Sequence, residues 1–318
     1  MAWGGVAGQE KFVAVSNTNT EFNRVMTSPD GFNWTLHKPS IVRQWNSVVW
    51  GGVHGQEKFV AVAQSGTGDR VMTSPDGFNW TTRASASNND WTNVAWGGMV
   101  NQQKFVAVAK SSAGTGGSPG YRVMTSPDGL NWTSRASAAS NQWAGVVWGG
   151  VNGQEKFVAV AFSGNGNCVM TSPDGITWTS QVSPENHKGN YVTWGGEIGQ
   201  QKFVAVAAAT SNNVMTSPDG ITWTGRAAAA NKNWGSVSWG GVAGLERFVA
   251  VAFSGQPSGT TMVSCDGITW TSGPVLAVGN SWRAMAWGGV TGQEKFVAVA
   301  QTGVGTRIMV GNFSDLTY

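Results

Sequence analysis

The stretch WNSVVWGGVHGQEKFVAVAQSGTGDRVMTSPDGFNWTTR, residues 45–83, decides the fold because versions of it recur along the whole chain. Its tripeptide Trp-Gly-Gly occurs at successive spacings of 47, 46, 52, 46, 45 and 48 residues, beginning at Trp3, Trp50, Trp96, Trp148, Trp194, Trp239 and Trp287. Self-similarity at a period of about 45 residues indicates a repeat architecture. The fold of the chain therefore follows from the structure of one repeat, which occurs seven times.

Each repeat contains four short runs rich in Val, Thr and aromatic residues, separated by Gly, Asn and Ser. In the quoted copy they are residues 46–50, 58–63, 70–74 and 79–83. Such runs predict strands, and no run shows the three- and four-residue apolar spacing of a helix. Four strands per repeat, repeated seven times, predict an all-β fold: a seven-bladed β-propeller with four antiparallel strands per blade. A solenoid would share the period, but it would leave sheet edges exposed that a closed ring hides.

We therefore expect residues 1–318 to form a single domain, with blades at approximately 1–40, 41–86, 87–138, 139–184, 185–229, 230–276 and 277–318. The chain contains 45 Gly and 18 Trp, and only 12% of its residues are charged. No apolar run approaches the roughly 20 residues of a membrane span. The repeat begins at once and leaves no room for a signal peptide, so we expect cytoplasmic synthesis, with non-classical release or association with a particle.

The motif SPDGxxWT resembles the Asp-box of sialidase-type propellers, although the turn is one residue shorter than that box. The wider pattern is similar to propeller repeats of uncharacterised bacterial and phage proteins. The resemblance implies that the Asp of each turn caps a hairpin and has no catalytic role. These structural aspartates are Asp30, Asp76, Asp128, Asp174, Asp219 and Asp266.

Charge is expected to differ between the two faces of the disc. The Trp-Gly-Gly turns and the Asp turns should share one face, the bottom face, where 7 basic and 13 acidic residues give 7 − 13 = −6. The remaining 13 basic and 4 acidic residues give 13 − 4 = +9 for the top face, where the loops vary between copies. Arginines recur there before the third strand and after the fourth, at Arg24, Arg70, Arg122, Arg307, Arg83, Arg135 and Arg226. A basic ring favours anionic partners, and ordinary solubilising arginine is the alternative interpretation.

The chain offers little for catalysis, and we expect neither an enzyme nor a metal nor a cofactor. Its three histidines are His37, His54 and His187, and none has the spacing of a metal ligand. A glycosidase would need Glu21 and Glu185 to converge with Asp69 or Asp90. Cys168 and Cys265 lie in non-adjacent blades, too far apart for a disulfide.

Aromatic residues that precede the first strand in six repeats suggest that the repeats carry several similar binding sites. Polar loops precede them, and aromatic faces beside amides and arginines suit sugars. They are Trp45, Trp91, Trp143, Tyr191, Trp234 and Trp282. The hypothesis is a non-catalytic, multivalent, lectin-like protein that binds glycans or another anionic polymer. The alternative role for these rings is packing between blades.

Two further functions stay open. One is a structural or virion-associated assembly protein that binds protein partners, and the weaker one is a sialidase-type glycoside hydrolase. Nucleic acid is not expected, because no Lys/Arg track with stacking aromatics is evident. We also expect Met1 to lie close to the final strand, with Trp3 and Phe313 packing between blades 1 and 7.

Overall fold

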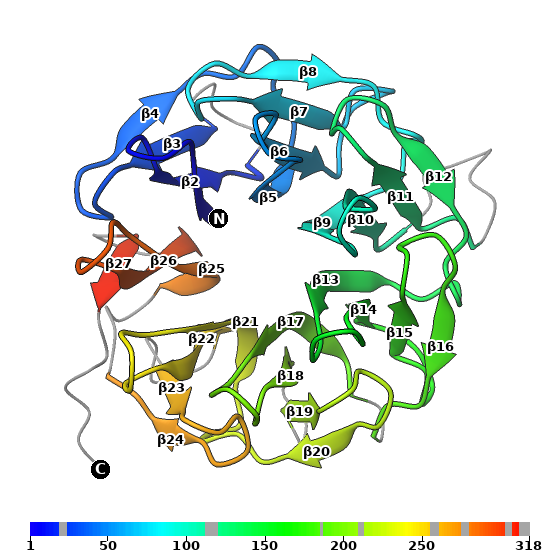
Figure 1. The fold of residues 1–318 in the computed structure, drawn as a ribbon, viewed down its shortest axis with the longest axis vertical. Coiled ribbons are helices and arrows are strands. Elements are labelled where there is room, and N and C mark those ends of the chain that lie inside the picture. The colour runs from blue at the N-terminus through cyan, green and yellow to red at the C-terminus, as the bar shows by residue number, and fades with distance from the viewer. Residues whose placement is uncertain are drawn as a thin grey trace.

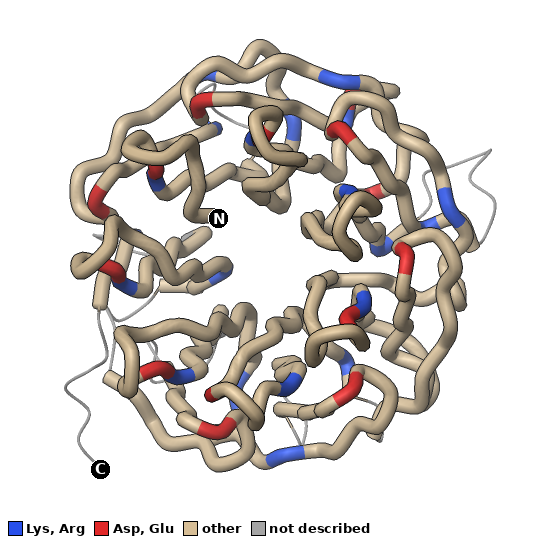
Figure 2. The backbone as a smooth tube through the Cα atoms, in the orientation of Figure 1, with Lys and Arg blue, Asp and Glu red and all other residues tan. Residues whose placement is uncertain are grey.

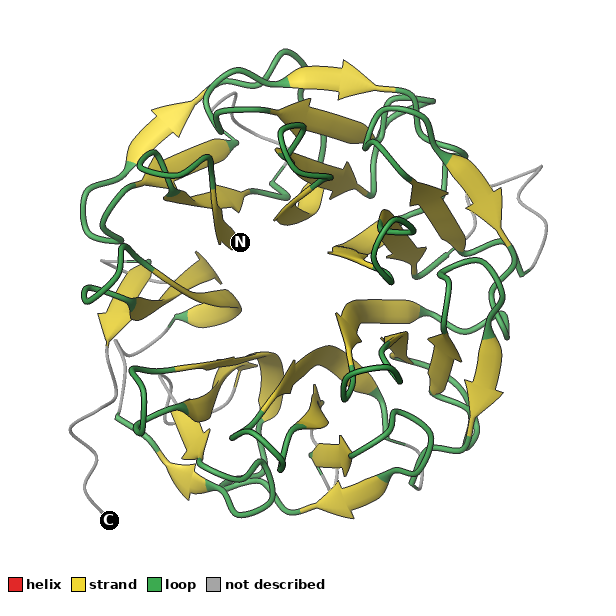
Figure 3. Ribbon diagram, viewed as in Figure 1, coloured by secondary structure: helices red, strands yellow, loops and turns green. Residues whose placement is uncertain are grey.

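The computed structural model describes residues 1–18, 24–111, 120–184, 187–208, 213–254, 261–274, 280–302 and 307–311. Seven antiparallel sheets surround a central axis like the blades of a fan (Figure 1). Figure 3 shows strands and loops only, with no helix in the described part of the chain. The predicted seven-bladed β-propeller is confirmed. No helix among the described residues is long and apolar enough to cross a membrane.

The strands follow the chain in order, from the innermost to the outermost of each blade. Blade 1 contains β1 (Ala2–Gly4), β2 (Lys11–Val15), β3 (Val25–Ser28) and β4 (Thr35–His37). Blade 2 contains β5 (Trp45–Gly51), β6 (Lys58–Ala63), β7 (Val71–Ser74) and β8 (Thr81–Arg83). Blade 3 contains β9 (Trp91–Gly97), β10 (Lys104–Ala109), β11 (Val123–Ser126) and β12 (Thr133–Arg135). Blade 4 contains β13 (Trp143–Gly149), β14 (Lys156–Ala161), β15 (Val169–Ser172) and β16 (Thr179–Gln181).

Blade 5 contains β17 (Gly189–Gly195), β18 (Lys202–Ala207), β19 (Val214–Ser217) and β20 (Thr224–Arg226). Blade 6 contains β21 (Asn233–Gly240), β22 (Arg247–Ser254), β23 (Thr261–Ser264) and β24 (Thr271–Ser272). Blade 7 contains β25 (Ser281–Gly288), β26 (Lys295–Thr302) and β27 (Ile308–Gly311), three strands within the described residues.

The second strand of each blade is the most deeply buried. In β6 every residue from Phe59 to Ala63 is fully buried, on both faces of the sheet. An apolar run without alternation suits a strand covered on both sides, and here the neighbouring blades supply the cover. The repeated KFVAV segment is thus the core of each blade.

Neighbouring blades meet where a tryptophan ring crosses a glycine. The ring of Trp96 in blade 3 lies so close to Gly51 of blade 2 that a Cβ at residue 51 would clash with it. The same contact joins Trp3 of blade 1 to Gly288 of blade 7, so the ring of blades closes through side-chain packing. β1 lies beside β25, the innermost strand of blade 7 (Figure 1), and not beside the final strand as expected for Met1. Phe313 lies outside the described residues.

A second ring of contacts runs along the bottom face. Lys11 Nζ of blade 1 donates a 2.9 Å hydrogen bond to the carbonyl of Asp76 in blade 2. Lys295 Nζ of blade 7 reaches the carbonyl of Asp30 in blade 1 at 3.2 Å. These bonds place the Trp-Gly-Gly turns and the Asp turns on the same face.

Each Asp turn is held by its own carboxylate. Asp76 Oδ1 accepts the backbone N–H groups of Phe78 and Asn79, at 2.8 Å each, and the hydroxyl of Ser74 at 2.9 Å. Gly77 has φ of 79°, which favours glycine at this place. Trp80 Nε1 donates back to the Gly77 carbonyl at 2.9 Å. The Asp side chain therefore replaces backbone partners that a tight turn cannot provide.

The Asp turns predict that the stability of the protein depends on pH. Desolvation alone would raise the pKa of Asp76, but the hydrogen bonds from Asn79, Phe78 and Ser74 outweigh it and lower the pKa to about 2. A carboxyl whose pKa is lowered by folding stabilises the protein above its unfolded pKa of about 3.9. We expect the free energy of unfolding to fall as pH drops from about 4 to about 2.

Urea titrations at several pH values measure this loss, and an Asp76→Asn variant should show a shallower acid dependence than the wild type. An identical acid dependence in the two proteins would contradict the role given to the turn carboxylate.

Candidate binding site in the central channel

A cavity of about 760 Å³ opens in the central channel, towards the top face. Its walls come from the starts of the innermost strands and from the ends of the second strands. The charged side chains that line it are all basic: Arg24, Lys110, Arg283 and Arg307. Its size falls within the usual range for small-molecule pockets, about 300–1,000 Å³.

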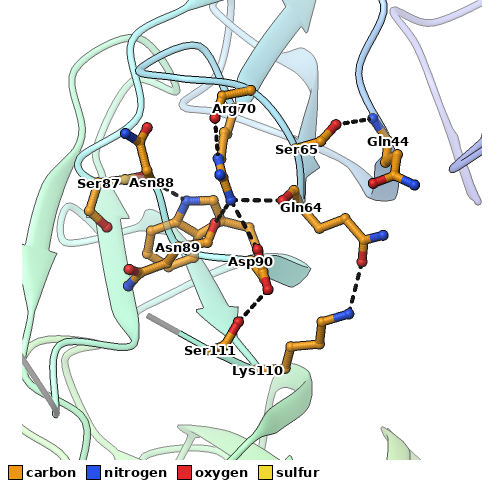
Figure 4. Close-up of polar contacts among 12 residues, drawn as sticks. Gln44, Gln64, Ser65, Arg70, Ser87, Asn88, Asn89, Asp90, Lys110 and Ser111 are labelled. Carbon is orange, nitrogen blue, oxygen red and sulfur yellow. Dashed lines mark hydrogen bonds and ion pairs between the residues drawn. The ribbon is translucent and has the colours of Figure 1, made fainter. Parts of the chain in front are cut away.

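Blades 2 and 3 supply one wall of the cavity, shown in Figure 4. Lys110 Nζ donates to Gln64 Oε1 at 3.0 Å, and Asn46 Nδ2 donates to the same oxygen at 3.3 Å. With its oxygen occupied, the Gln64 amide can offer its NH₂ group to a ligand. Asn46 Nδ2 also donates to the carbonyl of Trp91 at 2.8 Å, which fixes it to the next blade. This wall is a set of pre-positioned donors.

The same wall is held from behind by Arg70, which is buried. Its guanidinium donates to the carbonyls of Gln64 and Asn89, at 2.7 and 2.8 Å, and pairs with the Asp90 carboxylate at 3.1 Å (Figure 4). The other Asp90 oxygen accepts the hydroxyl of Ser111. Arg70 thus compensates the negative charge of Asp90, and it also positions the segment that carries Gln64.

Blade 7 supplies a second cationic wall, on the opposite side of the ring from blade 3 (Figure 1). Arg283 Nε donates to Gln301 Oε1 at 2.6 Å, and its guanidinium lies 4.6 Å from the ring centre of Phe253. A Cβ at Gly235 would clash with Phe253, so glycine makes room for that ring. Burial lowers the pKa of Arg283 from its ordinary value. The Arg283 side chain is exposed, so its positive charge, held over the Phe253 ring, can meet an anion in the cavity.

The predicted aromatic platforms are the main correction. The five tryptophans before the first strands are at most 1% exposed: Trp45, Trp91, Trp143, Trp234 and Trp282. The indole of Trp91 packs among Val62, Val71 and Phe105, and its Nε1 donates to the Ser87 carbonyl at 3.2 Å. A buried ring has no face to offer a sugar. The packing alternative describes these residues, of which Trp45 borders the cavity while its ring stays buried.

Tyr191 does not occupy the place of those tryptophans. In blade 4, Trp143 pairs with Ala161 and Gly145 with Val160; in blade 5, Gly189 pairs with Ala207 and Tyr191 with Val206. Gly189 therefore stands where blade 4 has its tryptophan. A Cβ at residue 189 would clash with Val160, which accounts for a glycine at this position. Tyr191 instead lines the cavity, half-buried. Burial raises the pKa of its phenol, opposed by a hydrogen bond with Asn93.

The expected basic ring is divided among three environments. Arg24 and Arg70 are buried, and Arg122 donates to the Lys110 and Asn141 carbonyls at 2.8 Å each. These three arginines hold the connections between blades. Three more donate from the outermost strands to a threonine of the same blade, at 3.0–3.2 Å: Arg83, Arg135 and Arg226. Arg307 is exposed and lines the cavity, which Arg24 also borders.

The histidines lie apart from one another. His37 shares a 2.8 Å hydrogen bond with Thr27, His54 is exposed on the bottom face, and His187 is buried in the connection before blade 5. The described residues contain no group of three His, Cys, Asp or Glu side chains suited to a metal. Glu21 and Glu185, which the glycosidase alternative requires, lie outside the described residues.

Sequence reasoning missed most of the residues that line the cavity. In blades 2 to 7 the residue that follows the buried Trp, or Gly189, of the innermost strand varies among five residue types: Asn46, Thr92, Ala144, Asn190, Gly235 and Arg283. The position after each second strand also differs, as in Gln64, Lys110 and Phe162. Among copies that otherwise match closely, these variable positions were the available signal.

No family model matches the chain, and no curated protein does. Among solved structures, YCF48 from Cyanidioschyzon merolae is 13% identical, with a TM-score of 0.61, over 94% of this chain and 92% of that one. BBS1N, solved in complex with ARL6DN, is 8% identical, with a TM-score of 0.65, over 98% and 90%. The GH74 xyloglucanase from Xanthomonas campestris is 13% identical, with a TM-score of 0.55, over 96% of this chain and 43% of that one. At these low identities, the similarities show that the fold is shared.

Proposed function

We propose that this protein is a binding module that holds an acidic glycan in its central cavity. The observation that carries the proposal is the lining itself: the described residues there include four basic side chains, several amides and no carboxylate. Cations attract the acidic groups of such a ligand, and amide NH₂ groups donate to its hydroxyls. Matches of this fold include both a xyloglucanase and a component of a protein complex, so the argument rests on the site.

The placement of the cations narrows the ligand. Lys110 belongs to blade 3 and Arg283 to blade 7, on opposite walls of the channel. A ligand with acidic groups at two separated points can contact both, whereas a single small anion contacts one. We therefore propose an oligosaccharide with at least two sulfate or carboxylate groups, bound one per disc.

The proposal is one of binding rather than catalysis. Within the described part of the chain, the cavity lining includes no carboxylate to act as a general acid or base. The lectin hypothesis keeps its ligand class, but the binding geometry changes from several aromatic pockets on the top face to one central site.

A glycan array of neutral, sialylated and sulfated sugars, read at low and high salt, tests the proposal. We expect sulfated and sialylated oligosaccharides to bind and neutral ones to fail. A Lys110→Gln/Arg283→Gln double variant should lose affinity at least tenfold. Lys188→Gln is the matched control, because Lys188 is exposed and does not line the cavity. Equal losses in the control, or equal binding of neutral sugars, would overturn the proposal.

A further inference from the structure

The bottom face carries exposed apolar side chains in a repeated arrangement. The first residue after Trp-Gly-Gly is 40–50% exposed in six blades: Val6, Val53, Met99, Val151, Val242 and Val290. In blade 5 that place holds Glu197, and the next residue, Ile198, is 96% exposed. These side chains form an inner ring near the channel.

A second ring lies farther out, on the Asp turns. The residue after each Asp-Gly pair is 36–65% exposed: Phe32, Phe78, Leu130, Ile176, Ile221 and Ile268. Isolated exposed apolar residues need no explanation, but contiguous apolar surface marks interaction sites. The two rings, repeated blade by blade, gather thirteen exposed apolar side chains on one face.

The cations of this face are turned into the protein. Lys11 Nζ lies 4.4 Å from the ring centre of Phe78 and bonds the Asp76 carbonyl, and Lys58 Nζ bonds the Asp128 carbonyl at 3.1 Å. Eleven of the twelve described carboxylate residues on this face are half-buried, and Glu197 is exposed, so the acidic groups reach solvent at least in part. For the described residues, seven basic side chains meet six Glu and six Asp, and 7 − 12 = −5. Figure 2 shows acidic residues spread around the whole ring.

We propose that this apolar–acidic face, the two rings with their carboxylates, docks a second protein that presents apolar side chains among lysines and arginines. Charge complementarity selects that partner, because like charges across an interface cost several kcal/mol. The same argument opposes a second copy of this face and an anionic lipid surface. This face lies opposite the opening of the cavity, so the two sites are independent.

Two synthetic amphipathic helices of equal length, one of leucine and lysine and one of leucine and glutamate, test the inference by isothermal titration. We expect the lysine peptide to bind, more weakly at high salt, and the glutamate peptide to fail. An Ile198→Ser/Phe78→Ser double variant should weaken binding of the lysine peptide at least tenfold. Val182→Ser is the control, because Val182 is 79% exposed and lies outside both rings.

Three results would overturn the inference: unchanged affinity in the double variant, equal binding of the glutamate peptide, or concentration-dependent self-association in sedimentation velocity that the double variant abolishes. The last would assign the face to a second copy. Acidic glycan binding in the cavity should be the same in the double variant and the wild type, which separates failure here from failure of the proposed function.

Discussion

Replacing Trp91 by alanine is expected to lower the free energy of unfolding by about 3–5 kcal/mol. The indole is fully buried between blades 2 and 3, and its removal leaves a cavity that the surrounding strands cannot fill. The Ser87 carbonyl also loses the partner that it has in Trp91 Nε1. Urea denaturation followed by tryptophan fluorescence measures the change, with linear extrapolation to water.

The control for this variant is Val182→Ala, which removes apolar atoms from a side chain that is 79% exposed. Its effect should stay within about 0.5 kcal/mol. A Trp91→Ala protein of nearly unchanged stability that had lost affinity for sugars would contradict the packing role. It would restore the hypothesis that the ring is a binding platform.

The same tryptophan shows where prediction from sequence ends. Its recurrence at one place in the repeat predicted a shared role, and the spacing of Trp50 and Trp96 predicted the blades correctly. Whether such a ring faces solvent or a neighbouring blade depends on what lies across the interface. For Trp91 the neighbours are Val62 and Val71, 29 and 20 residues earlier in the chain. No local pattern specifies that contact.

Tyr191 illustrates a different limit. Aligned by residue type, it replaces a tryptophan; aligned by strand pairing, it lies two residues farther along, opposite Val206. The bulge between Gly189 and Tyr191 separates the two alignments. A bulge bends a strand and redirects a side chain. That local geometry moves Tyr191 from the core position into the wall of the cavity.

Three of the predicted arginines show a third limit of sequence reasoning. Arg24, Arg70 and Arg122 occupy one place in the repeat, and a recurrent arginine resembles a recognition surface. Their partners are backbone carbonyls such as those of Arg43, Asn89 and Asn141. Every residue has a carbonyl, so sequence cannot distinguish the ones that need a donor. A buried carbonyl without a partner is costly, and these arginines supply the donors.

Replacing Gly288 by alanine is expected to destabilise the protein by about 1–3 kcal/mol, the range for overpacking a well-filled interface. An added Cβ would overlap Cγ of Trp3, a rigid ring held between blades 7 and 1. The backbone at Gly288 does not lie in the left-handed region, so the effect is steric. Thermal unfolding measures it, and Thr291→Ala, an exposed change in the same turn, is the control.

Gly51→Ala is the comparison variant for the Gly288→Ala prediction. A Cβ at Gly51 would overlap Trp96 in the same way, but between blades 2 and 3, which follow one another in the chain. Blades 7 and 1 have no such covalent link, and the described residues join them through Trp3 and through Lys295 bonded to Asp30. If the ring is closed in solution, the two alanine variants lose similar stability. A neutral Gly288→Ala beside a destabilised Gly51→Ala would mean that the ring opens between blades 7 and 1.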